Sequence, residues 1–359
     1  MINRNLTAIT ADIHHETAAQ IGDRFASFIE QWHSFREPYD DELDAWLHES
    51  YAKAKRTNKM KGMRWDIPSF APSSAGASDR ELYERVIKSK KDPADSIPAH
   101  QRRWTSQGTA IGDWLQRDLL LAERHFEKFT GNAPDFAVER TTDGYPAFED
   151  FVFTQTVGDH DGVEFSLVGT TDGILRHTTP DGDDIRVGLE IKTKQTTNAK
   201  TNSRGMQGPE DKHVQQCVVY SIMYGVDYFV LAYVNLSKKS WNMTPEERAA
   251  YPDFRTFGIY ITEEMREAVL ARFAGIVTLA KAKQAPAVDL NNWTFNAYKH
   301  AIVRKLTVED MDALEEQAKA MRKSRLPDYK KRAVLEAYDE VAELYEVLFE
   351  KFHGESGEA

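Results

Sequence analysis

Cysteine is almost absent from this sequence, because Cys217 is the only one among 359 residues. A single thiol excludes a disulfide within the chain and cannot supply the four thiolate ligands of an iron–sulfur cluster. The sequence also lacks an apolar run long enough to span a bilayer, and its first residues lack the apolar core of a secretory signal peptide. These absences predict a protein of the reducing cytoplasm with no membrane partner.

Several common catalytic motifs are missing as well. Neither a Walker sequence nor a GxGxxG sequence occurs, so hydrolysis of a nucleoside triphosphate is not expected. His14 and His15 have no partner at the spacing of a HExxH zinc site. Residues 181–184 begin like an EF-hand, but the twelfth position of that motif is Lys192 instead of a glutamate. Zinc and calcium sites of these two kinds are therefore excluded.

Positive charge is in deficit, since 46 Lys and Arg stand against 57 Asp and Glu, and the net charge is −11. That balance argues against indiscriminate nucleic-acid binding by the whole surface, but it leaves room for a local basic groove. Residues 53–64 contain six Lys or Arg and no acid. Residues 191–209 also contain no acid, and their basic residues are Lys192, Lys194, Lys200 and Arg204. Either run can also be an ordinary solvated surface.

Residues 168–192 have the pattern of a β-hairpin. Two strand-like runs flank a Pro/Asp/Gly cluster at 180–184, and such a cluster is a turn signal. A turn at 180–184 predicts two facing pairs, Asp172 with Lys192 and Ile174 with Glu190.

This register sorts the hairpin into two faces, because side chains alternate along a strand. The apolar face carries Leu175, Val187, Leu189 and Ile191. The charged face carries Asp172, Glu190 and Lys192, with the two carboxylates roughly 7–8 Å apart at the backbone. Two acids this close repel each other unless a cation lies between them, and their hard oxygens suit Mg²⁺ or Mn²⁺. Lys192 can then orient or deprotonate a water, or bind phosphate. The alternative is an ordinary surface hairpin with a Lys–Glu pair.

A helix is predicted over residues 213–224, with Gly225 as its stop signal. Its apolar stripe consists of Val214, Val218 and Ile222. Gln216 and Tyr220 are also four residues apart and lie on roughly the opposite face. Either these two polar side chains belong to the candidate site, or they are incidental and partly exposed.

These residues together resemble the PD-(D/E)XK nucleases, and the Gln-x-x-x-Tyr ending resembles the RecB-like branch of that family. The resemblance covers roughly residues 105–235 and rests on Asp172, Glu190-Ile191-Lys192 and Gln216-x-x-x-Tyr220. It implies that Asp172, Glu190 and the carbonyl of Ile191 are metal ligands and that Lys192 is the catalytic lysine. It implies further that Gln216 and Tyr220 position the DNA backbone near Mg²⁺ or Mn²⁺.

The sequence departs from this family at two places. The branch usually has a Gly-x-x-x-His helix whose histidine binds metal, whereas Gly108 is followed four residues later by Gly112. Asp113 comes next and can supply an oxygen ligand, or it is simply an acid near the start of a helix. Many relatives also hold an iron–sulfur cluster, but Ser78 stands where the first of the four cysteines would be. No iron–sulfur cluster is expected.

The second basic run directly follows the candidate site, which favours phosphate contact by Lys194, Lys200 and Arg204. The resemblance implies DNA as the substrate and an exonuclease as the first choice, in phage-type recombination, repair or replication. A structure- or sequence-specific endonuclease, or a non-catalytic DNA-binding protein on a degenerate core, are the alternatives. A single-strand annealing or recombination protein is an expected partner, in the cytoplasm of a bacterial or phage-infected cell.

The expected fold class is α/β, a restriction-endonuclease-like mixed sheet of about five strands flanked by helices. Helical additions are expected at both ends of the chain. The predicted division is a helical region over 1–65, a nuclease core over 66–262 and a second helical region over 263–359.

Overall fold

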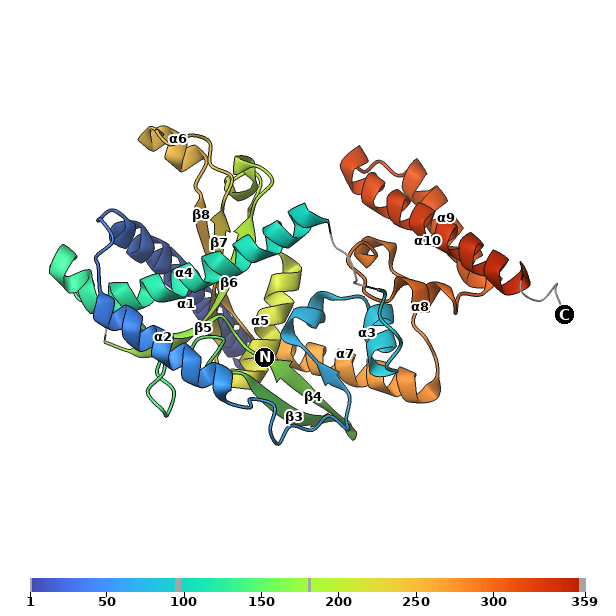
Figure 1. Cartoon of the computed structure of the whole chain (residues 1–359), viewed down its shortest axis with the longest axis horizontal. Helices are drawn as coiled ribbons and strands as arrows, with labels where there is room; N and C mark the ends of the chain where they lie inside the picture. The colour runs from blue at the N-terminus through green and yellow to red at the C-terminus, as the bar shows by residue number, and fades with distance from the viewer. Residues whose placement is uncertain (1, 94–97, 180–181, 355–359) are drawn as a thin grey trace.

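The computed structural model describes residues 2–93, 98–179 and 182–354 (Figure 1). The strands are β1 (Ser69–Phe70), β2 (Phe136–Val138), β3 (Thr154–His160), β4 (Val163–Gly169), β5 (Gly173–Thr178), β6 (Asp184–Lys194), β7 (Tyr228–Asn235) and β8 (Phe254–Tyr260). The α-helices are α1 (Ile2–His33), α2 (Asp41–Arg56), α3 (Asp79–Val86), α4 (Ala99–Thr130), α5 (Asp211–Tyr224), α6 (Pro245–Ala250), α7 (Glu263–Ala282), α8 (Lys299–Val303), α9 (Val308–Lys323) and α10 (Asp328–Gly354). Short 3₁₀ turns are η1 (Pro72–Gly76), η2 (Asn198–Thr201) and η3 (Leu290–Asn292).

A five-stranded mixed sheet forms the centre of the molecule, in the order β2-β5-β6-β7-β8. Within this sheet, as described, only the β6–β7 pair is parallel, because α5 carries the chain from the end of β6 back to the start of β7. The residues of β7 are nearly all buried, as expected for an apolar strand covered on both faces. The strands β5 and β6, which carry the candidate site, are also interior strands of this sheet.

The β5–β6 hairpin forms, but the predicted register is wrong by two residues. Ile174 pairs with Gly188, not with Glu190, and Gly173 pairs with Leu189. The cause is a tighter turn, in which the amide of Thr179 donates to the carbonyl of Asp183. Residues 180 and 181 of the predicted turn lie outside the described residues. A shift of two leaves every side chain on its predicted face, because the period of a strand is two.

The corrected register changes the predicted facing pair of Asp172. Extending the observed pairing by one residue places Asp172 opposite Glu190, and not opposite Lys192 as predicted. The apolar face is as expected: Leu175, Val187, Leu189 and Ile191 pack in one cluster with α1 and α4. The two acids are thus direct neighbours across the hairpin.

A second, smaller sheet has the order β1-β4-β3. The β3–β4 hairpin turns at Asp161 and Gly162, both of which have positive φ. From the sequence, residues 151–157 and 163–169 are predicted to be strands joined by a turn at 158–162, but the pattern does not separate them from the central sheet. The two sheets share a core with α5 and α7, in which Phe70 stacks on Phe273.

Helices cover both faces of the central sheet (Figure 1). On one face, α1 approaches β8 so closely that a Cβ on Gly258 would lie 1.6 Å from the carbonyl oxygen of Ala18. On the other face lie α5 and α7. The expected fold class, a mixed α/β sheet flanked by helices, is confirmed. The predicted domain boundaries stay predictions, although α1 and α7 pack directly on strands of the predicted core.

The helices after α7 form a third apolar cluster, which lies on the side of α3 (Figure 1). It includes Trp293 and Ile302, and the α9–α10 pair closes it with Leu314 and Val341. Among the described residues, no helix combines the length and the apolar character that crossing a bilayer requires.

Candidate active site

Glu190 is a carboxylate buried inside the central sheet, with 1% of its surface exposed. One of its oxygens forms an ion pair with the ammonium of Lys192. Its other oxygen, Oε2, has no hydrogen-bond partner among the described residues. Burial first, and then the nearby charge of Asp172, raise the pKa of Glu190 to about 8 against the opposing effect of Lys192. A buried acid with an oxygen left unpaired is an unusual feature that calls for a cation or a proton.

Asp172 lies immediately before β5 and is held from two directions. Its Oδ2 accepts a 2.6 Å hydrogen bond from the backbone N–H of Ile191. Its carbonyl oxygen accepts a 2.7 Å hydrogen bond from the side-chain amide of Gln116 on α4. Burial raises the pKa of Asp172, and the bond from Ile191 only partly opposes that effect. The main chain therefore fixes this carboxylate beside β6.

Lys192 connects the strand to α5. Besides its ion pair with Glu190, its ammonium donates a 3.1 Å hydrogen bond to Oε1 of Gln216. The amide of Gln216 in turn donates a 2.8 Å hydrogen bond to the hydroxyl of Tyr220. Both Gln216 and Tyr220 are buried. Strand and helix thus form one hydrogen-bonded chain, Glu190–Lys192–Gln216–Tyr220.

A second group of acids, Asp113, Glu149 and Asp150, lies beside the first. Phe148 forms a bridge with Gly173, so extending that pairing by one residue places Glu149 opposite Asp172. Burial raises the pKa of Glu149, and the charges of Asp172, Asp150 and Asp113 raise it further. Asp150 is held by Lys55 of α2 and by Lys59, which follows that helix, with N–O distances of 2.7 Å and 3.0 Å.

Asp113 lies at this second group. Partial desolvation is the main cause that raises the pKa of Asp113, and the charge of Asp150 raises it further. The charge of Asp113 in turn raises the pKa of Glu149. The structure therefore brings Asp172, Glu190, Lys192, Gln216 and Tyr220 together, and places Asp113 with Glu149 and Asp150.

The donor set at Asp172 and Glu190 fits a divalent cation of the magnesium type. Two neighbouring carboxylates with raised pKa values, one with an unpaired oxygen, suit an ion that keeps waters as its other ligands. Among the described residues, however, no three His, Cys, Asp or Glu side chains converge closely enough to hold a metal by themselves. Water or substrate oxygens would have to complete the coordination shell.

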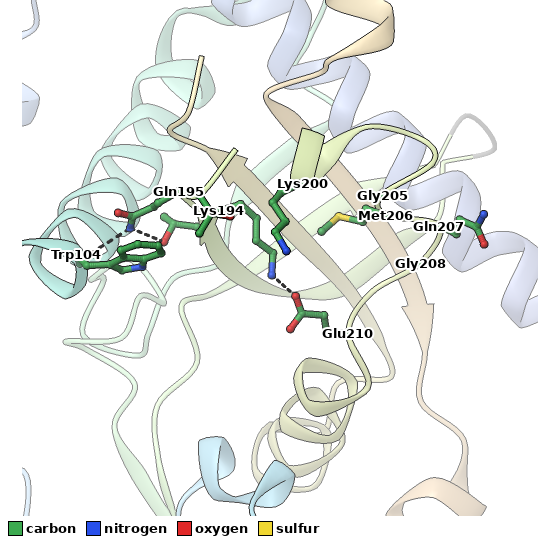
Figure 2. A pocket seen from close by; sticks show the side chains of 11 residues that line it. Trp104, Lys194, Gln195, Lys200, Gly205, Met206, Gln207, Gly208 and Glu210 are labelled. Atoms are coloured by element: carbon green, nitrogen blue, oxygen red, sulfur yellow. Dashed lines mark hydrogen bonds and ion pairs between the residues drawn. The ribbon is translucent and has the colours of Figure 1, made fainter. Parts of the chain in front are cut away.

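Two of the predicted DNA-binding residues line a pocket of about 380 Å³ at the end of β6 (Figure 2). Lys194 and Lys200 line it, whereas Arg204 is exposed on the loop nearby and is not part of its wall. Lys194 forms an ion pair with Glu210, the residue that precedes α5. The sequence pattern does not predict that Glu210 pairs with Lys194, because Glu210 lies just after the acid-free run of 191–209.

Two residues of the site are missed by reasoning from sequence. Gln116 binds the main chain at Asp172, and its Oε1 has no partner among the described residues. It lies on α4 three residues after Asp113, one helical turn from the residue singled out. Glu149 lies in an irregular segment, and only its neighbour Asp150 marks that segment as acidic. Helical periodicity could therefore have indicated Gln116, whereas no periodic pattern indicates Glu149.

The fold and the site together describe an α/β protein with a carboxylate–lysine cluster buried between a sheet and a helix. No family model and no curated protein matches the chain. Solved structures similar to it include that of SSO0001, with 15% identity, coverage of 73% of this chain and 98% of that chain, and a TM-score of 0.34.

Two further solved structures are similar to a comparable degree. The alkaline exonuclease LHK-Exo from Laribacter hongkongensis is 12% identical, with 60% of this chain and 89% of that chain covered and a TM-score of 0.32. Rai1 from Scheffersomyces stipitis, in complex with (3'-NADP)⁺ and calcium, is 10% identical, with 69% of each chain covered and a TM-score of 0.23. Similarity at these scores carries no information about activity, which must come from this chain's own residues.

Proposed function

We propose that this protein is a Mg²⁺- or Mn²⁺-dependent DNA nuclease that hydrolyses phosphodiester bonds, and that it acts as an exonuclease. The observation that carries the proposal is the cluster of the buried Glu190 with the partly buried Asp172 and Lys192. These two acids and one ammonium lie together in the sheet, with Oε2 of Glu190 unpaired. Withdrawing ionisable groups wholly or partly from water costs free energy, and such groups are concentrated at functional sites.

Each residue of the cluster has a proposed role. Asp172, Glu190 and the carbonyl of Ile191 hold the ion, and Asp113 is proposed as a further oxygen ligand. When bound, the ion neutralises charge at the phosphate and lowers the pKa of a coordinated water. Lys192 orients the attacking water or stabilises the charge that develops on the phosphate.

Gln216 and Tyr220 are proposed to act through Lys192. Both side chains are buried and bonded in series to its ammonium, which supports positioning of the lysine more directly than contact with DNA. Lys194, Lys200 and Arg204 are proposed to bind the phosphates of the strand. The choice of an exonuclease over an endonuclease rests on the Gln-x-x-x-Tyr resemblance, whose branch is rich in enzymes that process ends.

A second candidate function is DNA binding without catalysis. One observation favours it: no three acidic, histidine or cysteine side chains of the described segments converge as metal ligands. A protein of this kind would keep the fold and the basic loop and would bind DNA without cutting it.

Digestion of DNA in two topological forms tests the proposal. End-labelled linear DNA and covalently closed circular DNA are incubated with Mg²⁺, with Mn²⁺ and with EDTA. The proposal expects metal-dependent loss of the linear DNA and survival of the circle. Cutting of the circle would establish the endonuclease, and binding without cutting under every metal condition would establish the non-catalytic protein. Asp172→Ala and Glu190→Ala should each abolish cleavage while the protein stays folded.

A further inference from the structure

The pocket beyond Lys192 lies directly along the path of β6. Lys192 and Lys194 are two residues apart on one strand, so their side chains share a face at a spacing of roughly 6–7 Å. The pocket has a volume of about 380 Å³, which falls within the roughly 300–1,000 Å³ range of small-molecule sites. Its walls come from the end of β6, the first turns of α4 and the loop that leads into α5. A group bound in it would adjoin the carboxylate–lysine cluster.

The charges in this pocket are unbalanced. Lys194 and Lys200 both point toward Glu210 (Figure 2), but only Lys194 forms an ion pair with it. Within the described part of the chain, Lys200 has no acidic partner. The carboxylate of Glu210 is thus shared among several cations, since Lys212 also lies 3.2 Å away. A second anion is needed to neutralise the pocket, and phosphate is the anion that a nucleic acid supplies.

Besides these charged groups, the pocket has an apolar aromatic surface, the ring of Trp104. Its side chain lines the same pocket from α4 and is 44% exposed, although a tryptophan ring usually avoids water. The amide of Gln195 donates a 3.2 Å hydrogen bond to the carbonyl of Trp104, which ties this turn of α4 to the end of β6. An exposed aromatic ring beside lysines is the combination that binds single-stranded nucleic acid, by base stacking and phosphate contact.

We propose that this pocket binds one nucleotide of the substrate strand, with the base stacked on Trp104 and a phosphate between Lys194 and Lys200. The carboxylate of Glu210 occupies Lys194 in the free protein and gives up that ion pair when the phosphate enters. The identity of the strand as DNA rests on the proposed function; the pocket itself rests on its own residues. Glu210 therefore weakens binding, whereas Trp104 and the lysines strengthen it.

This arrangement predicts effects of opposite sign from neighbouring residues. Glu210→Gln frees Lys194 and should tighten binding of single-stranded DNA about threefold to tenfold, since it uncovers about one phosphate contact. Trp104→Ala should weaken binding by about fivefold or more, because one base loses its stacking surface. Trp104→Phe keeps an aromatic face and should bind within about twofold of the wild type.

The experiment measures binding of a fluorescent ten-nucleotide oligo(dT) by anisotropy in EDTA, so that no metal is bound and no cleavage occurs. Glu247→Gln is the matched control, because it removes one negative charge from an exposed Lys–Glu pair elsewhere. Unlabelled thymidine 5′-monophosphate and thymidine are added as competitors. The proposal expects the phosphate-bearing competitor to displace the oligonucleotide at lower concentration than the nucleoside, and expects Glu247→Gln to bind like the wild type.

Several results would overturn the pocket assignment. They are no binding of oligo(dT) by the wild type, a Glu210→Gln protein that binds no more tightly than Glu247→Gln, or a Trp104→Ala protein that binds as well as Trp104→Phe. Thermal melting of each variant shows whether it is folded. Failure of the proposed nuclease activity looks different: DNA stays uncut with Mn²⁺, while Glu210→Gln and Trp104→Ala still shift affinity in opposite directions.

Discussion

At the scale of single residues, the contacts of Lys192 distinguish a candidate catalytic site from an ordinary surface ion pair. Its side chain is 23% exposed. It forms an ion pair with the buried Glu190 and donates a hydrogen bond to the buried Gln216. A surface Lys–Glu pair contributes at most about 1 kcal/mol, and it needs no second partner from a helix. The hydrogen bond to Gln216 is therefore the feature that the alternative interpretation of the sequence, a simple surface pair, does not explain.

Lys192→Ala separates chemistry from binding. The variant should bind DNA in Ca²⁺ nearly as well as the wild type, because affinity depends on many phosphate contacts. It should cleave about 10²–10³-fold more slowly in Mg²⁺, which is the usual loss for one electrostatic contact to the transition state. Lys192→Arg should not restore the rate fully, since the guanidinium is larger and keeps its proton. Single-turnover cleavage at saturating enzyme measures the rate. A rate within a few-fold of the wild type would remove Lys192 from the mechanism.

Glu190 predicts a pH-dependent affinity for metal. Its pKa is raised to about 8, so without metal the carboxyl group holds its proton up to about that pH. A cation must displace this proton, and the apparent affinity for Mn²⁺ should therefore rise about tenfold per pH unit below 8 and level off above it. Calorimetry at pH 7 in buffers of different ionisation enthalpy should detect about one released proton. Glu190→Gln should bind Mn²⁺ more weakly and release none. Equal proton release by both proteins would contradict the assignment.

At the scale of elements, the sequence predicts the hairpin and the helix that carry the candidate site. Alternation along β6 sorts the apolar from the charged side chains correctly, and the stop signal at Gly225 marks the end of α5, where its φ is +62°. The predicted register is wrong because register depends on the hydrogen bonds of the turn. Thr179 donates to Asp183, two residues before the position that the predicted turn would place opposite it. Turn geometry of this kind is set by a few local bonds that a Pro/Asp/Gly cluster does not specify.

The packing of α1 on β8 depends on glycine at both contact positions. A Cβ on Gly258 would lie 1.6 Å from the carbonyl oxygen of Ala18, and a Cβ on Gly22 would lie 2.3 Å from the amide of Gly258. Gly258→Ala should therefore lower the free energy of unfolding by about 3 kcal/mol or more, because backbone must move to admit the methyl group. Urea denaturation measures this change.

Gly275→Ala is the control for that substitution. Gly275 lies in α7 with no atom within 4 Å of an added Cβ, so alanine there should raise the free energy of unfolding by about 0.5–1 kcal/mol. Similar effects of Gly258→Ala and Gly275→Ala would show that α1 does not rest against β8 as described.

At the scale of the whole molecule, the order of predicted strands and helices predicts the fold class but not how the parts are joined. The strands β3 and β4 follow one another directly before β5 in the chain, yet they form a sheet of their own with β1. Which sheet a strand joins depends on contacts between residues far apart in sequence, and local periodicity does not encode these. The proposed roles of the site residues likewise stay predictions, because distance and burial define where they lie but not what they do.

The C-terminal helices are joined to α3 through one buried carboxylate. Glu84 of α3 is fully buried, and its oxygens accept from Arg80 at 3.2 Å and from Ser89 and Lys305. Lys305 follows α8, so this contact links the third apolar cluster to the rest of the molecule. A buried charge that loses a partner is costly, whereas an exposed pair that is lost matters little.

Lys305→Ala should therefore destabilise the protein by about 1–3 kcal/mol, less than the 3–5 kcal/mol of a fully broken buried pair because Arg80 and Ser89 remain on Glu84. Lys319→Ala is the control: this lysine of α9 pairs with exposed acids on its own helix and should cost under about 0.5 kcal/mol. Urea denaturation gives both values, and a cycle with Glu84→Gln should show a coupling energy of about 0.5–3 kcal/mol between Glu84 and Lys305. Equal losses from Lys305→Ala and Lys319→Ala, or additive effects in the cycle, would mean that the C-terminal helices are held to α3 by apolar packing and not by this ion pair.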